Sequence, residues 1–243
     1  MAAQSTRARR DDDWTPALPD RDTIPENERA AYDSVVELQL AYSYGDYVKR
    51  FIHEEMRLSF PGDRIQPYFA ALLNSPRVAA GMSDLGAVYR TRGDTPDGLT
   101  HAHREWVDIV VCDEVRCRFV LYGHAADAVA SGVRAEAVLA IVQGRDEGLT
   151  VDERLRADFV RAVVRGTMTA ELYTAVQDEV GVRAAVEMTA FTGHLIKTLR
   201  VMQAWGIADI ASAQLEEYVQ AIVDGRVELP EGARVPAAGV PAS

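Results

Sequence analysis

Apolar residues recur at helical spacing along most of this chain, and segment after segment ends in a glycine. Ser75 followed by Pro76 is a favourable helix start, because serine caps the first turn and proline suits the first helical position. Thr150 and Glu153 have the spacing of a capping box, which opens a helix that ends before Gly166. Strand alternation bounded by hairpin turns is missing. The sequence therefore predicts an all-α fold.

Further helices are expected along the chain. The helix that starts at Pro76 runs toward Gly93. We also expect helices over residues 27–44, 46–59, 64–73, 100–111, 113–131, 134–143, 170–180 and 182–205. Glycine is the usual residue just beyond a helix end, where a left-handed conformation is needed. Helix ends are accordingly predicted at Gly132, Gly144, Gly181 and Gly206.

The length of 243 residues suits one substantial domain with tails. Prolines and charges dominate the first 25 residues, and prolines and glycines recur in the last 18. We predict a flexible N-terminal tail (1–25), an N-terminal helical extension (26–62), a helical domain (63–225) and a C-terminal tail (226–243).

Charge and hydropathy exclude several classes of protein. The 37 acidic residues outnumber the 26 basic ones and give a formal net charge of −11, so nucleic acid is not an expected partner. No apolar run approaches the roughly 20 residues of a membrane span, and the polar N-terminus lacks the order of a signal peptide. We expect a cytoplasmic protein that does not contact membranes.

Cysteine and histidine positions argue against disulfides and metal sites. The two cysteines, Cys112 and Cys117, are five apart in a stretch expected to be helical, so they face different sides and a reducing compartment fits them. The five histidines do not have zinc-finger spacings. His101 and His103 point to opposite sides of a helix start, so a shared metal ion is not expected. The sequence predicts no metal and no cofactor.

Glu105, Cys117 and His124 are the candidate catalytic residues. Cys117 and His124 are seven positions apart, so they share a helix face but are separated by roughly 10.5 Å of axial rise. They cannot pair directly in an undistorted helix. Glu105 belongs to the preceding helix, and a break near Cys112 would let that helix pack against the next one. Its carboxylate would then orient His124, tune Cys117 or take a proton itself.

A resemblance to a known superfamily covers residues 67–206. The segments that carry it are PYFAALLNSPRVAAGMSDLGAVYR, the Arg104-Glu105 pair, CRFVLYGHAADAVASGV and MTAFTGHLIKTLRVMQAWGI. In these segments the chain resembles the carboxymuconolactone decarboxylase and alkyl hydroperoxidase D-like superfamily. The resemblance implies an alkyl hydroperoxidase D-like helical bundle, here with an N-terminal helical extension, and a carboxymuconolactone decarboxylase-like domain over 63–225.

The two branches of this superfamily imply different chemistry. In the hydroperoxidase branch a glutamate lies twelve residues before a Cys-x-x-Cys motif that a histidine follows, and Glu105, Cys117 and His124 match these positions. Val120 stands where the second cysteine would be, and Phe119 replaces a histidine. Disulfide-based reduction needs a resolving thiol. The decarboxylase branch, which uses acid–base residues in the same pocket, therefore resembles this chain better.

The expected function is that of a cofactor-independent lyase or isomerase acting on a small carbonyl or lactone-carboxylate compound. Glu105 and His124 are the acid–base pair, and Cys117 lines the pocket. Arg116 and Arg118, together with the helix N-terminus, would lower the pKa of Cys117, or else the two arginines are solvated surface charges. Two alternatives stay open: a thiol peroxidase with an incomplete redox motif, and a non-catalytic ligand-binding or assembly protein. The expected substrate-binding residues are Arg104, Val120 and His194. The resemblance also implies a homo-oligomer, a trimer or a multiple of it, with a dimer as the alternative.

Overall fold

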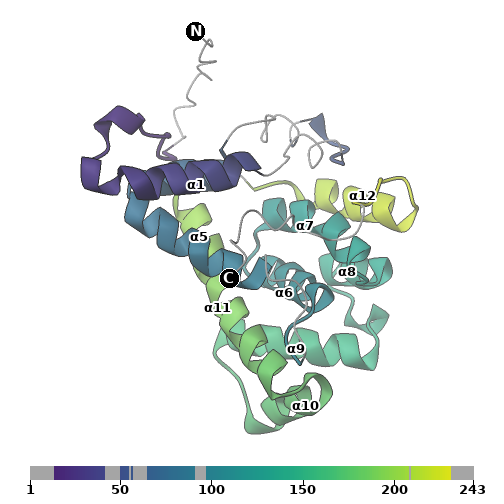
Figure 1. Ribbon diagram of the computed structural model, residues 1–243. Helices are drawn as coiled ribbons and strands as arrows, with labels where there is room; N and C mark the ends of the chain where they lie inside the picture. The colour runs from purple at the N-terminus through teal and green to yellow at the C-terminus, as the bar shows by residue number, and fades with distance from the viewer. Residues whose placement is uncertain are drawn as a thin grey trace.

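The structure is a computed structural model that describes residues 14–41, 50–54, 56, 65–90, 97–207 and 209–230. All regular elements within these residues are helices, which confirms the predicted all-α fold (Figure 1). Most of the expected helix over 46–59 and most of both predicted tails lie outside the described residues.

Ten α-helices and three short 3-10 helices are described. Their bounds are η1 (Arg21–Thr23), η2 (Glu26–Glu28), α1 (Arg29–Ala41), α4 (Pro67–Leu72), α5 (Pro76–Arg90), α6 (His101–Glu114), α7 (Arg118–Ala130), α8 (Ala135–Val142), η3 (Asp146–Gly148), α9 (Val151–Arg165), α10 (Ala170–Val180), α11 (Val182–Ala204) and α12 (Ser212–Val223).

Local start and stop signals behave as the sequence predicts. Helix α5 begins at Pro76. The Thr150 hydroxyl accepts a hydrogen bond from the Glu153 backbone N–H, and the Glu153 carboxylate accepts one from the Thr150 backbone N–H, so α9 opens with the predicted capping box. It ends at Gly166, where φ is 68°. The other predicted glycine stops also have positive φ: Gly132, Gly144, Gly181 and Gly206.

The junction between α6 and α7 lies three residues later than predicted. The expected break near Cys112 is wrong, because Val111 and Cys112 are fully buried and extend the packed face of α6 to Glu114. The chain turns at Arg116 with φ of 57°, and the backbone N–H of Cys117 donates to the Cys112 carbonyl at 2.8 Å. Neither glycine nor proline marks this turn.

Helix α12 was not predicted. Four apolar residues at helical spacing bury its inner face against α7 and α8: Leu215, Tyr218, Val219 and Ile222. Its start is weakly marked, because Ala211 at the N-cap offers no side-chain oxygen to the first turn.

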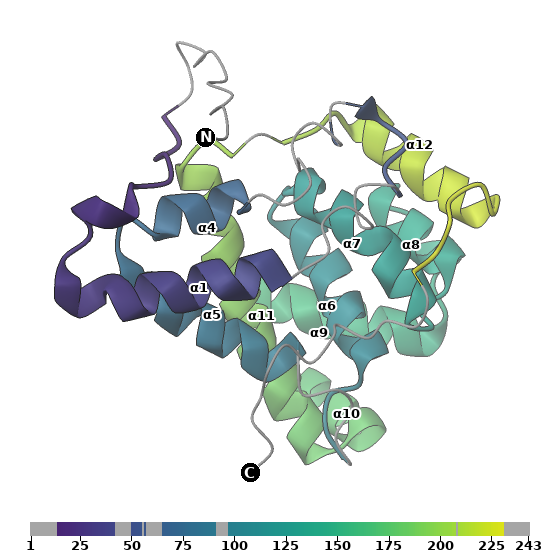
Figure 2. The ribbon, with the colours of Figure 1, turned by 45° about the horizontal axis from the view of Figure 1, so that its top comes forward.

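Helix α6 is the centre of the structure. It packs against α7, α8, α9 and α11, while α1 pairs with α5, and α10 with α9 and α11 (Figures 1 and 2). Every residue from Arg104 to Cys112 is buried. A helix surrounded on all sides must place its polar side chains inside the protein, and Glu105 and Asp108 are two of these.

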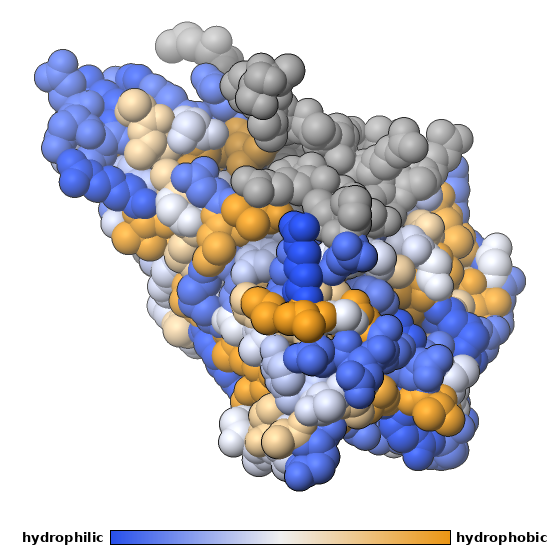
Figure 3. All heavy atoms as spheres, turned by 60° about the horizontal axis from the view of Figure 1, so that its bottom comes forward, coloured by the Kyte–Doolittle hydropathy of each residue, from blue (hydrophilic) through white to orange (hydrophobic). Residues whose placement is uncertain are grey.

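The described surface is mixed in character. On the face drawn in Figure 3, hydrophobic residues are interspersed with hydrophilic ones. Helix α5 exposes Val78, Leu85 and Val88, which lie on one side of the helix. Among the described helices, none combines the length and the apolar character that a bilayer span requires.

Candidate active site

Glu105 and His124 are brought into contact by the packing of α6 on α7. The Thr100 hydroxyl accepts a hydrogen bond from the His103 backbone N–H and so fixes the start of α6, with Glu105 in the following turn. The turn over residues 115–117 then returns the chain along α6 as α7. His124 Nδ1 lies 2.9 Å from Glu105 Oε2, within hydrogen-bond distance. The expected contact between these two side chains is therefore present.

A second imidazole faces the other oxygen of Glu105. His101 lies one turn earlier on α6, and its Nε2 is 3.4 Å from Glu105 Oε1. The Glu105 side chain is only 6% exposed, while His101 and His124 are 17% and 18% exposed. The Glu105 carboxylate thus lies inside the protein between two imidazoles, and both imidazoles reach the surface of the protein.

Asp108 completes this cluster, and sequence reasoning missed it. Its side chain is fully buried, and its Oδ2 lies 4.0 Å from His124 Nδ1. The signal was its position three residues after Glu105, which places both carboxylates on one side of α6. Ligand atoms of Glu105, Asp108 and His124 all lie within 4.8 Å of one another, so these residues could hold a metal ion. The sequence had predicted no metal site.

The Glu105 hydrogen bond determines which imidazole nitrogen of His124 is available for chemistry. When the Glu105 carboxylate is ionised it only accepts hydrogen bonds, and Nδ1 of His124 then carries the proton that it donates to Glu105. Nε2 is then the nitrogen left to exchange protons with another molecule. Two buried carboxylates are costly unless positive charge or hydrogen bonds compensate them, and both imidazoles can supply these.

Cys117 has a different environment from the one expected. It is the N-cap of α7, not a residue within the helix, and it is only 6% exposed. Burial raises the pKa of its thiol to about 11; a hydrogen bond from the Val120 backbone N–H and the charge of Arg200 act against this, and Asp209 adds to it. A thiol with this pKa is almost entirely protonated near neutral pH.

Asp209 adds to the effect of burial on the pKa of Cys117 and also occupies the N-terminus of α7. Its Oδ1 accepts a hydrogen bond from the Phe119 backbone N–H at 3.0 Å, and its Oδ2 lies 2.7 Å from Arg118 Nη1. The N-terminus of α7 is therefore capped by a residue about 90 positions later in the chain. This carboxylate compensates the positive charge that would otherwise favour a thiolate.

The three predicted substrate-binding residues have separate surroundings. Arg104 is buried, and its Nη1 donates a hydrogen bond to the Leu99 carbonyl at 2.8 Å, just before α6. Val120 is half-buried and packs against the hydrophobic core. His194 on α11 has its ring 5.7 Å from that of Tyr89 on α5, and its Nδ1 is 3.3 Å from Lys197 Nζ.

Comparison of the chain with protein-family models, curated proteins and solved structures finds no match. The resemblance to the carboxymuconolactone decarboxylase and alkyl hydroperoxidase D-like superfamily therefore stays a prediction. The contacts among Glu105, His101, Asp108 and His124 are independent of that resemblance.

Proposed function

We propose that this protein is a cofactor-independent acid–base lyase or isomerase that acts on a small carbonyl or lactone-carboxylate compound. The observation that carries the proposal is the 2.9 Å contact between Glu105 Oε2 and His124 Nδ1. A buried carboxylate that holds one imidazole nitrogen leaves the other nitrogen oriented for proton transfer. His124 remains 18% exposed, so it can be reprotonated from solvent.

In the lyase reaction, the bond between the carboxylate group and the carbon next to a carbonyl breaks. Its electron pair forms an enolate, and carbon dioxide leaves. The imidazolium of His124 gives its Nε2 proton to the enolate carbon, while the Nδ1 proton stays on the hydrogen bond to Glu105. Solvent then restores the Nε2 proton.

In the isomerase reaction, neutral His124 takes a proton from the carbon next to the carbonyl on Nε2. The same nitrogen returns the proton at another carbon of the enolate. Glu105 has the same role in both reactions, since it stabilises the imidazolium and fixes the direction of the ring. In this proposal Cys117 is present as a neutral thiol. Arg104, Val120 and His194 have separate surroundings, so their contact with the substrate stays a prediction.

The thiol peroxidase alternative has less support. Peroxide reduction requires a thiolate, and burial raises the pKa of Cys117 to about 11. Cys112, the other cysteine of the chain, is fully buried on α6, unlike the accessible thiols that take part in disulfide exchange. The predicted homo-oligomer also stays a proposal, and the exposed apolar residues of α5 offer a surface for it.

The test is a mass-spectrometric screen of the protein against lactones, β-keto acids and hydroperoxides, with EDTA present throughout. We expect a lactone or β-keto acid to be converted by the wild type and by Glu136→Gln, a control at an exposed glutamate of α8. His124→Gln should lower the rate by roughly 10²- to 10⁴-fold, and Glu105→Gln should also lower it. Full activity of a correctly folded His124→Gln variant would refute the proposal.

A further inference from the structure

We propose that Glu105, Asp108 and Nδ1 of His124 form a binding site for a divalent transition-metal ion, and that the bound ion prevents the acid–base use of His124. The metal site itself stands on the geometry of these residues. Only the inhibitory effect rests on the proposed function.

The ligand atoms are close to the spacing that an ion needs. Two ligands in a tetrahedral site, each about 2.1 Å from the metal, are separated by about 3.4 Å. His124 Nδ1 is 2.9 Å from Glu105 Oε2 and 4.0 Å from Asp108 Oδ2. The first of these separations is about half an ångström shorter than that spacing and the second about half an ångström longer, and all three ligand atoms lie within 4.8 Å of one another. Side-chain rotations would therefore be enough to place one nitrogen and two oxygens around an ion.

The surroundings of these residues also suit a metal. Glu105 and Asp108 lie three residues apart on the buried helix α6, so their relative positions are fixed by the helix. His101 Nε2 lies 3.4 Å from the second oxygen of Glu105 and would serve as an outer-shell partner that orients this ligand. The site would therefore have two ligands on α6 and one on α7.

Charge and donor type indicate which ions fit. The Glu105 side chain is 6% exposed and Asp108 is fully buried, so a doubly positive ion would compensate two carboxylates that water cannot solvate well. One imidazole and two carboxylates suit Mn²⁺, Fe²⁺, Co²⁺ or Zn²⁺. Calcium prefers six to eight oxygen ligands, which three side chains do not provide.

Metal and proton compete for the same atom of His124. A metal ion needs the lone pair of Nδ1, but this nitrogen carries the proton that it donates to Glu105. On binding, a neutral ring must move its proton to Nε2, and an imidazolium must release one proton to solvent. The metal-bound ring cannot form the imidazolium that proton delivery requires.

Cobalt binding to tag-free protein, stripped with EDTA and then dialysed, tests this site. Titration with Co²⁺ at about pH 7.5 is followed by visible absorption and by calorimetry. We expect one ion per chain. Affinity should fall at least tenfold in Asp108→Asn and His124→Gln and roughly 10- to 100-fold in His101→Gln. Asp178→Asn, at an exposed aspartate of α10, should bind as the wild type does.

Absence of binding, or equal affinity in the wild type and His124→Gln, would overturn the metal site. Circular dichroism checks that each variant is folded, and His124→Gln carries the test if Asp108→Asn fails to fold. The two proposals fail separately, because cobalt binding is measured without substrate and turnover is measured in EDTA. Unchanged turnover in the presence of saturating cobalt would refute the proposed inhibition but would not contradict the metal site.

Discussion

Tyr122 of α7 and Tyr218 of α12 lie face to face, with ring centroids 3.8 Å apart and ring planes inclined by 5°. Both side chains are fully buried. Their hydroxyl groups differ, because that of Tyr122 accepts hydrogen bonds from the backbone N–H groups of Ile52 and His53. The Tyr218 hydroxyl has no hydrogen-bond partner among the described residues. The stacked pair therefore offers a matched comparison of two buried hydroxyls.

Removal of the two hydroxyls should have different effects on the free energy of unfolding. Tyr122→Phe leaves two backbone donors without their acceptor, so we expect a loss of about 1–3 kcal/mol in the free energy of unfolding. Tyr218→Phe removes a buried polar group that makes no bond to the described residues, so stability should stay the same or rise. Urea unfolding followed by circular dichroism measures both. Equal losses in the two variants would contradict the assignment of the hydrogen bonds to Tyr122.

The Cys117 thiol should react slowly with alkylating reagents. A pKa of about 11, against an ordinary value of 9.0, lowers the thiolate fraction near pH 8 by about 100-fold. Burial slows the reaction further. Iodoacetamide labelling of native and urea-unfolded protein, with peptide mass spectrometry to separate Cys117 from Cys112, measures the difference. Labelling of native Cys117 as fast as in urea would show that its thiol is exposed and ionised.

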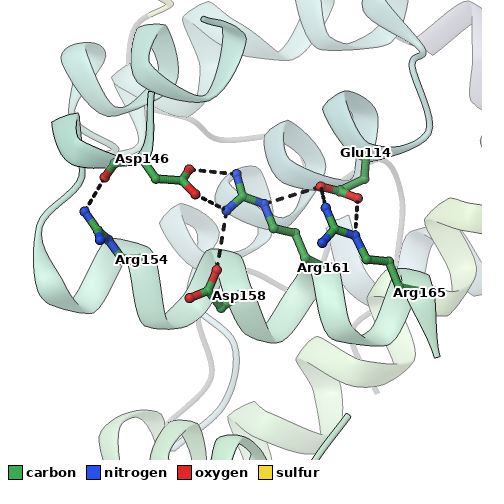
Figure 4. A network of polar contacts seen from close by, with 6 residues as sticks. All are labelled: Glu114, Asp146, Arg154, Asp158, Arg161 and Arg165. Atoms are coloured by element: carbon green, nitrogen blue, oxygen red, sulfur yellow. Dashed lines mark hydrogen bonds and ion pairs between the residues drawn. The ribbon is translucent and has the colours of Figure 1, made fainter. Parts of the chain in front are cut away.

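A polar network joins the C-terminal end of α6 to α9 (Figure 4). Arg161 contacts the carboxylates of Asp146, Asp158 and Glu114, and Arg165 also pairs with Glu114. The Arg161 and Glu114 side chains are each 12% exposed, whereas Arg165 is 58% exposed. The network lies beside the turn that leads from α6 to α7.

Arg161 should matter more to stability than Arg165. Arg161→Ala leaves a mostly buried Glu114 with one fewer partner, and we expect a loss of about 1–3 kcal/mol. Arg165→Ala removes an exposed partner and should cost less than about 1 kcal/mol. Thermal or urea unfolding of both variants tests this order. A larger loss in Arg165→Ala would contradict it.

The same network should contribute to stability against acid. Hydrogen bonds from Arg161 lower the pKa of Asp146. A lowered folded-state pKa gives stability that is present above the ordinary value of about 3.9 and is lost as the pH falls through the folded value. The contribution is small, because Asp146 is 43% exposed. Arg161→Ala should therefore lose less stability than the wild type when unfolding is compared between about pH 6 and pH 3. An identical loss would show that the pairing is absent in solution.

Position 206 should require glycine for two reasons: its positive φ and the lack of space for a side chain. Its φ is 65°, and a Cβ atom there would lie 2.8 Å from the Trp14 ring. The Trp14 ring nitrogen donates to the Ala204 carbonyl, which holds the indole at the end of α11. Gly206→Ala should cost about 1–2 kcal/mol. The cost should shrink in a Trp14→Ala background, and an unchanged cost there would show that the ring does not lie on this glycine.

Sequence reasoning succeeded where short-range signals decide the structure. The capping box of Thr150 and the proline start of α5 depend on neighbouring residues only, and both are confirmed. The contact between Glu105 and His124 followed from two helices that are consecutive in the chain. The assignment of catalysis to that pair stays a prediction.

Tertiary packing decided what sequence reasoning missed. Arg116 adopts a left-handed conformation without being glycine, because the packing of α6 and α7 fixes the turn. Asp209 caps α7 from about 90 residues away, so no local pattern shows it. Asp108 joins the cluster because α6 is buried on every side, which depends on four other helices.

The short turn between α6 and α7 also bears on the order of events in folding. Glu105 and His124 are 19 residues apart, whereas 77 residues separate Arg50 from its ion-pair partner Asp127. The entropy lost on closing a loop grows with its length, so a helical hairpin forms more readily than a contact between distant segments. We expect the Glu105–His124 pair to meet as soon as this hairpin forms, with residues 50–54 and α12 then docking onto a hairpin that already exists.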